Sequence, residues 1–362
     1  MMSDQLKVTT PGRICLFGEH QDYLGLPVIP CAISLRITLT GGRKEWKELR
    51  VFLPDIGTSI SIPLGPPVVY QAERDYFRSV VNVMLRRGFT FSRGCQCTVR
   101  GKIPINAGTS SSSALVVTWV NFLARISDQE KALPAPEIAR IAHEAEVLEF
   151  REPGGMMDHF STACGGVMWL RFHPDLAMEV LTPPLGTFVL GDSMEPKDTK
   201  GILARVKNGV LEIVTRLRAG YPDYSLQTET AEGLLRYAKD LTGQEQTMLR
   251  GTIRNRDITR EARELLGQRP LDERKFGAML NEHQAVLRDV LGISTPKIDR
   301  MIDAAIRSGA FGGKINGSGG GGCMFAYAPE GPEAVAEAIE RSGGTAFIVR
   351  PDTGTTAQLI KE

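Results

Sequence analysis

The sequence has few of the features that mark disulfide-rich, zinc-binding or membrane-spanning proteins. Its six cysteines are scattered and include no Cys-x-x-Cys pair, which argues against a zinc cage or a disulfide framework and is typical of a reducing compartment. No apolar run approaches the about 20 residues that a membrane helix needs. Residues 1–7 contain no apolar core of a signal peptide. We therefore expect a cytoplasmic protein that does not bind a membrane.

An excess of charge of one sign is also missing. The 43 Lys and Arg residues nearly balance the 42 Asp and Glu residues, for a net charge of +1, so no electrostatic feature indicates nucleic acid as a partner. The Gly-Lys-Ser/Thr sequence of a Walker loop is absent. We expect small molecules as partners, and a chain that is a monomer or a homodimer.

The length of 362 residues favours two domains. Pro183-Pro184-Leu185-Gly186 is the clearest linker signal, so we place the domains at 1–185 and 186–362. Strand and helix patterns interleave without a regular βαβ count, which predicts an α+β fold. Strands are expected at 8–10, 14–17, 28–33, 49–53, 60–62, 95–99, 167–172, 187–190, 324–328 and 346–350; helices are expected at 71–88, 115–123, 135–150, 198–218, 228–240, 256–267, 271–291, 296–308 and 332–342.

A run of hydroxyl side chains leads into the apolar helix predicted at 115–123. The run is Gly108-Thr109-Ser110-Ser111-Ser112-Ser113. The start of a helix has unpaired N–H groups and the positive end of the helix dipole, so it binds phosphate well. Small residues let phosphate oxygens approach the backbone. An ordinary helix cap, where Ser and Thr are also favoured, is the alternative interpretation.

A second glycine-rich stretch covers residues 312–323 and includes Gly317, Gly319, Gly320 and Gly322. It matches G-x-G-x-x-G, but it is predicted to follow a helix and to open a strand, which is the wrong context for a dinucleotide fingerprint. We interpret it as a close approach of the backbone to a ligand or to another loop. A turn that lets a helix and a strand pack closely is the alternative.

Several acidic side chains could act together with these loops. Asp158 follows two glycines and two methionines, and a carboxylate there could accept a proton from an alcohol; the alternative is a turn aspartate. Glu146 could bind magnesium, or it could lie on an exposed helix face. Arg13 could keep Asp158 ionised. A phosphate-binding loop, a metal ligand and a base together indicate phosphoryl transfer.

Close to Arg13, the loop that contains Glu19, His20 and Asp22 could hydrogen-bond several substrate hydroxyls. Surface salt bridges are the alternative for this set.

Three motifs in order resemble the galactokinase branch of the GHMP kinases. Residues 11–23, Pro-Gly-Arg-Ile-Cys-Leu-Phe-Gly-Glu-His-Gln-Asp-Tyr, resemble its first motif. Residues 104–114 resemble the second, with Asn106 in place of a glycine and Thr109 in place of a leucine, and residues 314–323 resemble the third. The resemblance covers the whole chain.

The resemblance implies an ATP- and Mg²⁺-dependent small-molecule kinase, with an N-terminal domain like ribosomal protein S5 domain 2 and a ferredoxin-like C-terminal domain. It implies Asp158 as the base and Arg13 beside it, and Glu146, Ser111 and Ser112 at the magnesium ion. ATP would contact Gly108, Thr109, Ser110, Ser111, Ser112, Ser113, Gly319 and Gly320. The sugar would contact Glu19, His20, Asp22 and Gly155.

Some residues depart from the galactokinase pattern: Gln21 stands in place of Thr and His159 in place of Gln, and residues 191–200 lack a galactokinase tyrosine and look nearer to mevalonate kinase. We therefore predict a sugar kinase that acts on a monosaccharide hydroxyl, most simply the anomeric one. Mevalonate or another small alcohol is the second hypothesis, and a non-catalytic galactokinase-like sensor is the third. Asp22 favours a polyol over an anionic acceptor, and the complete second motif with Asp158 favours catalysis.

Overall fold

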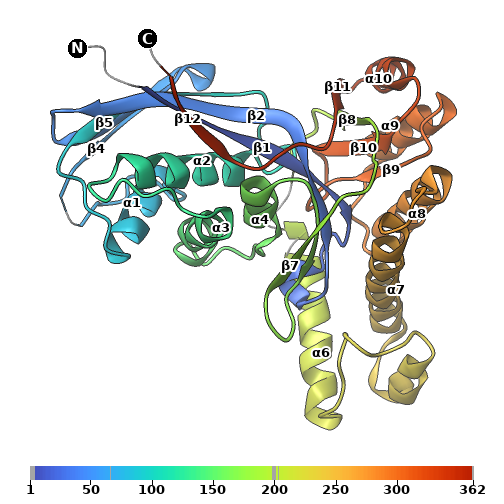
Figure 1. Cartoon of the computed structure of the whole chain (residues 1–362). Coiled ribbons are helices and arrows are strands. Elements are labelled where there is room, and N and C mark those ends of the chain that lie inside the picture. The colour runs from blue at the N-terminus through green and yellow to red at the C-terminus, as the bar shows by residue number, and fades with distance from the viewer. Residues whose placement is uncertain (1–4, 66, 198–200, 203, 361–362) are drawn as a thin grey trace.

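The computed structural model describes residues 5–65, 67–197, 201–202 and 204–360. Within these ranges the strands form two sheets, one of eight strands and one of four. Figure 1 shows the larger sheet with its helices on the left and the smaller sheet with its helices on the right. None of the described helices combines the length and the apolar composition needed to cross a membrane.

The larger sheet has the strand order β12-β1-β2-β5-β3-β4, and β6 joins it through β2 and carries β7. Its strands are β1 (Gln5–Phe17), β2 (Ile29–Lys44), β3 (Glu48–Leu53), β4 (Thr58–Pro63), β5 (Gly94–Gly101), β6 (Val167–Arg171), β7 (Ala177–Leu181) and β12 (Thr356–Ile360). Strand β12 comes from the end of the chain and pairs antiparallel with β1. The last strand therefore completes the sheet of the N-terminal half.

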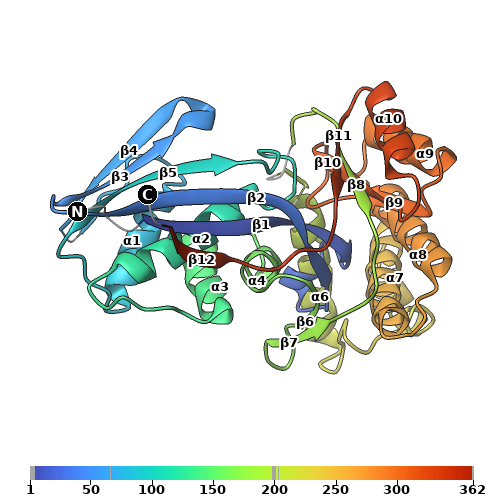
Figure 2. The ribbon, with the colours of Figure 1, turned by 45° about the horizontal axis from the view of Figure 1, so that its top comes forward.

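Helices α1 (Tyr76–Arg86), α2 (Ser111–Ile126), α3 (Ala135–His143) and α4 (Met157–Cys164) pack beneath this sheet (Figures 1 and 2). The core between them is apolar and aromatic: the Trp119 ring stacks on Phe122 and meets the edge of Phe77. Burial of such large side chains supplies most of the driving force for folding. Helix α2 is almost entirely buried after its first turn, so its N-terminus is held at a fixed place.

The smaller sheet has the order β11-β8-β10-β9, with β8 (Phe188–Asp192), β9 (Gly312–Ile315), β10 (Cys323–Tyr327) and β11 (Thr345–Val349). Its helices are α6 (Gly209–Gly220), α7 (Gly243–Leu266), α8 (Glu273–Ala285), α9 (Pro296–Arg307) and α10 (Pro332–Arg341). Helices α9 and α10 pack against the sheet, while α6 and α7 extend away from it (Figure 1).

The structure differs from the sequence prediction in several places. The glycine-rich loop follows a strand, β9, and not a helix as expected, because Gly312–Ile315 pairs with β10. Asp158 lies in the first turn of a helix, α4, that was not predicted. The helix expected at 135–150 continues from α3 into a π-helical turn, Glu144–Leu148. Part of the helix expected at 198–218 lies outside the described residues.

Candidate functional site

The serine-rich segment forms the turn that opens α2. Ser110 precedes the helix with a φ of 59°, and Asn106 and Gly108 have φ values of 57° and 85°. Asparagine tolerates this left-handed conformation better than most residues, so it can stand where the second motif usually has glycine. Ser111 is half-buried and Ser112 is exposed. The unpaired amides at this helix start can therefore receive an anion from solvent.

The glycine-rich loop packs directly on the serine-rich segment. The side-chain amide of Asn316 donates to the Gly108 carbonyl at 2.8 Å, and the Cys323 amide donates to the Ala107 carbonyl at 2.8 Å. A Cβ on Gly317 would lie 2.9 Å from the Gly108 carbonyl oxygen, so only glycine allows this approach. Of the two roles considered for this loop, contact with another loop is therefore the one that the structure shows.

Within the glycine-rich loop, the two glycines expected to contact ATP already lie against the protein itself. The Gly320 amide donates to the Ile293 carbonyl at 2.7 Å, and a Cβ on Gly319 would lie 2.5 Å from the same oxygen. Both glycines thus fix the loop on the segment before α9. Their expected contact with ATP is a prediction that these bonds do not test.

Arg13 connects the first motif to both Asp158 and the serine-rich segment. Its Nε and Nη2 atoms lie 2.9 Å and 2.8 Å from Asp158 Oδ1, and its Nη1 donates to the Gly108 carbonyl. Strand β1 is irregular on both sides of Arg13, at Pro11/Gly12 and at Cys15/Phe17, and such bulges re-aim side chains. The Arg13 side chain is 4% exposed and that of Asp158 is 31% exposed. The carboxylate therefore remains accessible to a ligand.

Electrostatics keep Asp158 ionised. Burial alone would raise the pKa of its carboxyl, but the charge of Arg13, followed by His159 and hydrogen bonds, lowers the pKa below its ordinary value. An ionised carboxylate of low pKa orients a hydroxyl well and accepts its proton only late. Phosphoryl transfer through a loose transition state has that requirement.

The loop that follows β1 contains Glu19, His20 and Asp22, and we call it the acceptor-side loop. Its Asp22 lies near Asp158 and Arg13. His20 Nε2–H donates to the Ser318 carbonyl at 3.0 Å, and its Nδ1 accepts from the Tyr23 hydroxyl at 2.6 Å. Burial lowers the pKa of His20 to about 4, so the ring is neutral at pH 7. Both ring nitrogens already have protein partners.

Asp22 lies against the backbone just before Asp158. A Cβ on Gly155 would lie 1.8 Å from Asp22 Oδ2, so the carboxylate occupies the space beside this glycine. Burial first, and then the charge of Asp158, raise the pKa of Asp22 to about 6, against the opposing amides of Tyr23 and Met157. The two carboxylates are therefore near enough to repel each other.

Glu19 is buried within the protein. Its Oε2 accepts a hydrogen bond from Lys314 Nζ at 2.6 Å, and its Oε1 accepts from the Gly317 amide at 3.3 Å. The two side chains of this ion pair are 2% and 0% exposed. Both oxygens of Glu19 therefore bond to the third motif, although the sequence alone suggested a contact with substrate hydroxyls.

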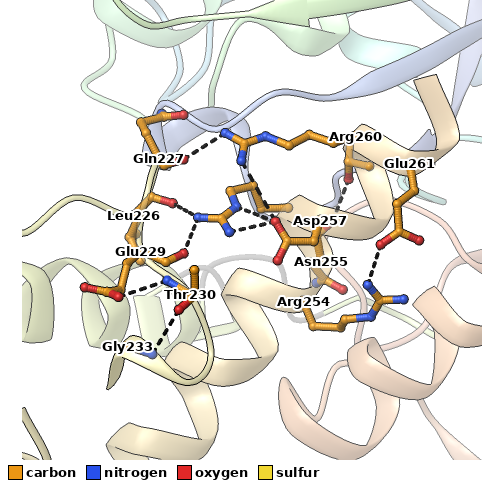
Figure 3. Close-up of polar contacts among 12 residues, drawn as sticks. Leu226, Gln227, Glu229, Thr230, Gly233, Arg254, Asn255, Asp257, Arg260 and Glu261 are labelled. Atoms are coloured by element: carbon orange, nitrogen blue, oxygen red, sulfur yellow. Dashed lines mark hydrogen bonds and ion pairs between the residues drawn. The ribbon is translucent and has the colours of Figure 1, made fainter. Parts of the chain in front are cut away.

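The acceptor-side loop is supported from the C-terminal half. Gln227 Nε2 donates to the Gly25 carbonyl at 2.6 Å. Arg260 on α7 donates to the Gln227 carbonyl (Figure 3). The neighbouring Arg256 donates to the carbonyls of Leu226 and Glu229. The two arginines thus attach residues 226–229, which bond the Gly25 carbonyl through Gln227, to helix α7.

Glu146 lies in the π-helical turn and is 7% exposed. Its Oε2 bonds His159 Nε2 at 2.8 Å, so His159, which replaces the glutamine of the motif, orients this carboxylate. Among the described residues no group of three or more His, Cys, Asp and Glu side chains could hold a metal ion. Any magnesium ion would therefore need oxygen donors from elsewhere, such as phosphates.

Lys197 is a site residue that the sequence interpretation missed. Its Cδ lies 2.7 Å from where a Cβ on Gly322 would be, and its Nζ lies 3.1 Å from where a Cβ on Gly108 would be. Lys314 and Asn316 were missed as well. The latter two belong to the third motif and could have been singled out there, whereas nothing in the pattern around Lys197 marked it.

Comparisons with known proteins agree with this geometry. The galactokinase galactose-binding signature matches residues 3–43, the N-terminal domain of GHMP kinases matches residues 75–166, and their C-terminal domain matches residues 262–345. The mevalonate kinase of Thermococcus gammatolerans is 28% identical over 357 residues, covering 94% of each chain. Human galactokinase is 27% identical over 382 residues, covering 98% of this chain and 92% of its own.

The crystal structure of Lactococcus lactis galactokinase complexed with galactose has a TM-score of 0.86 to this chain, with 21% identity and coverage of 97% and 95% of the two chains. This likeness confirms the predicted two-domain architecture with mixed α and β structure. The three motif regions, the two matched domains and the relatives agree: the chain belongs to the GHMP kinases, phosphotransferases with an alcohol group as acceptor.

Proposed function

We propose that this kinase transfers the γ-phosphoryl group of ATP to a hydroxyl of a monosaccharide, the anomeric 1-hydroxyl. One observation carries the choice of acceptor: Asp22 and Asp158 lie close enough for their charges to interact, beside the same glycine turn. Two neighbouring carboxylates can accept hydrogen bonds from several hydroxyls of a neutral sugar. They would repel an acceptor that carries its own carboxylate.

In this proposal each side chain has a defined task. Asp158 accepts the hydrogen bond of the attacking hydroxyl and takes its proton as the new O–P bond forms. Arg13 holds Asp158 in place and ionised. The start of α2, from Gly108 to Ser113, binds the phosphates of ATP through its amides. Asp22 and the Gly155 backbone orient the sugar, and His20, whose two ring nitrogens bond Tyr23 and Ser318, holds their loop in place.

Oxygen donors that would hold a magnesium ion are also present. Ser111, Ser112 and Glu146 offer oxygen donors, the ligand type that Mg²⁺ prefers. The buried Glu146 carboxylate already has one oxygen oriented by His159, as is usual for metal-binding carboxylates. When bound, the ion neutralises charge on the phosphate oxygens.

We assign Glu19 a different task from the one that the resemblance implies. Because both of its oxygens bond to Lys314 and Gly317, we propose that it fixes the acceptor-side loop on the third motif. Its effect on sugar binding would then pass through His20, whose Nε2 bonds the neighbouring Ser318 carbonyl. Sugar hydroxyls would contact Asp22 instead.

Mevalonate, or another non-sugar alcohol, is the second candidate acceptor. The 28% identity to a mevalonate kinase over nearly the whole chain supports it. The two candidates differ in charge, since mevalonate is an anion and a monosaccharide is neutral.

A coupled assay of ADP release over a panel of monosaccharides and mevalonate tests the proposal. We expect turnover with at least one aldose and none with mevalonate. Phosphorylation at the anomeric position also removes the reducing end, so loss of reducing sugar should match ADP formed one to one. Turnover with mevalonate alone, or a product that keeps its reducing end, would contradict the proposal.

A further inference from the structure

Lys197 follows β8 and lies between the two loops that form the phosphate side of the site. Its aliphatic stem passes over Gly322, and its ammonium group ends beside Gly108. A Cβ on Gly322 would collide with the Lys197 stem, at 2.7 Å from its Cδ. A Cβ on Gly108 would collide with the backbone, at 2.7 Å from the Asn316 carbonyl oxygen. The glycines thus leave a channel that the lysine occupies.

The Lys197 ammonium lies near both a cation and a carboxylate of the site. Arg13 and Asp158 are near enough to shift the pKa of Lys197, Arg13 downward and Asp158 upward, while burial, the largest cause, lowers it to about 8. The ammonium is therefore still mostly charged at pH 7. Asp158 is already bonded to Arg13, and Asp22, the second carboxylate near Asp158, accepts from the Tyr23 amide. A desolvated ammonium that shares its neighbouring carboxylate with an arginine favours an anionic ligand.

The position of the Lys197 ammonium identifies the ligand atoms. The ammonium lies beside Gly108, at the turn that opens α2 and is expected to hold phosphate. It also lies within electrostatic reach of Asp158, where the attacking hydroxyl would be. A phosphoryl group that lies between the turn at Gly108 and the hydroxyl at Asp158 is the terminal, γ-phosphoryl group of the triphosphate.

We propose that Lys197 is a further catalytic residue that contacts the transferring γ-phosphoryl group of ATP. As the acceptor oxygen bonds to the γ-phosphorus, the bond from that phosphorus to the β–γ bridging oxygen breaks, and ADP leaves with the electron pair while Asp158 takes the hydroxyl proton. Lys197 stabilises the charge on the γ-phosphoryl oxygens during this transfer. The inference rests on the phosphoryl transfer of the proposed function, but not on the choice of sugar.

Nucleotide binding tests this contact without any acceptor. Calorimetry would measure the affinities of Mg-AMP-PNP and Mg-ADP for the wild type, Lys197→Met and Lys197→Arg, with Lys275→Met on the exposed face of α8 as the control. We expect Lys197→Met to weaken AMP-PNP about tenfold or more and ADP less than about threefold, the loss of one charge-assisted bond. Lys197→Arg should recover most of the AMP-PNP affinity.

The same variants are then assayed with whichever acceptor the wild type uses best. We expect kcat to fall about 100-fold in Lys197→Met, as for loss of one transition-state contact, with the acceptor KM nearly unchanged. Equal AMP-PNP affinity in wild type and Lys197→Met, or equal losses for AMP-PNP and ADP, would overturn the proposal. Thermal unfolding of Lys197→Met and a second variant, Lys197→Gln, shows whether folding is retained. If no sugar is turned over, the proposed acceptor is wrong, but the nucleotide result still decides the role of Lys197.

Discussion

At the scale of single residues, the site depends on one carboxylate kept charged inside a partly buried environment. Arg13 contacts Asp158 through two nitrogens and reaches the Gly108 carbonyl with a third. One side chain therefore both keeps Asp158 ionised and ties it to the turn that opens α2. Replacing Arg13 or Asp158 should therefore change the chemistry of the site, whereas breaking an exposed ion pair changes little.

Asp158→Asn keeps the shape of the side chain but removes its charge. We expect kcat to fall about 10²–10⁴-fold, the usual contribution of a general base, because an amide can orient the hydroxyl but cannot take its proton. Mg-AMP-PNP affinity, measured as a control, should change little. Near-normal turnover in Asp158→Asn would exclude Asp158 from this role.

Asp22 should give the acceptor a pH dependence. Its pKa is raised from an ordinary value of 3.8 to about 6, so the carboxylate is ionised above pH 6 and becomes protonated as the pH falls below it. Because the ionised form only accepts hydrogen bonds and accepts stronger, charge-assisted ones, kcat/KM for the acceptor should decline below about pH 6. The profile should be flatter in Asp22→Asn. Measuring KM for ATP across the same range separates this effect from titration of the nucleotide, and an identical profile in both proteins would contradict it.

At the scale of elements, short backbone turns set the positions of the functional groups. Helix α2 begins with a left-handed Ser110, and α4 begins two residues after Gly155. In each turn a glycine, Gly108 before α2 and Gly155 before α4, leaves room for another segment. Glycine at these points is required by packing as much as by backbone flexibility.

Two adjacent glycines offer a matched pair of variants at the start of α4. A Cβ on Gly155 would lie 1.8 Å from Asp22 Oδ2, whereas a Cβ on Gly154 would lie no nearer than 3.4 Å to any neighbour, a Val147 methyl. We expect Gly155→Ala to raise the acceptor KM about tenfold by displacing Asp22, a loss comparable to one charge-assisted hydrogen bond. Gly154→Ala should keep KM within about twofold. Equal KM values in the two variants would show that Asp22 does not bind the acceptor.

At the scale of the whole molecule, the two sheets meet at the site through buried polar contacts. Lys314 on β9 belongs to the smaller sheet, and Glu19 follows β1 of the larger one. Asn316 donates to Gly108 and accepts from the Cys15 amide. These contacts fix the phosphate side of the site relative to the acceptor side.

The buried pair of Glu19 and Lys314 should therefore contribute to stability as well as to geometry. Glu19→Gln leaves a fully buried ammonium without its counter-charge, which we expect to lower the free energy of unfolding by about 3–5 kcal/mol. Urea denaturation measures this change. Glu179→Gln, which breaks the exposed pair with Arg263, is the control and should cost less than about 1 kcal/mol. Similar losses of unfolding free energy in Glu19→Gln and Glu179→Gln would show that the buried pair contributes no more to stability than an exposed one.

Local patterns were sufficient to predict many elements. The apolar run at 115–123 lies inside α2, and the run at 167–172 overlaps β6, because burial of a continuous apolar stretch dominates locally. Strands β7 and β12 were missed, since the residues of both are largely exposed and β12 pairs with β1, at the other end of the sequence. Helix α4 was missed because it is short and follows a glycine turn.

The sequence by itself determined the family, since three motifs in the right order specify the loops and the acids that phosphoryl transfer needs. Only the tertiary structure decided which side chains are available to substrate. It directs Glu19 to Lys314, His159 to Glu146 and Lys197 to the phosphate turn. The reason is physical: a buried charged or polar group must find a partner across the fold, and that partner depends on how distant segments pack, which no local pattern records.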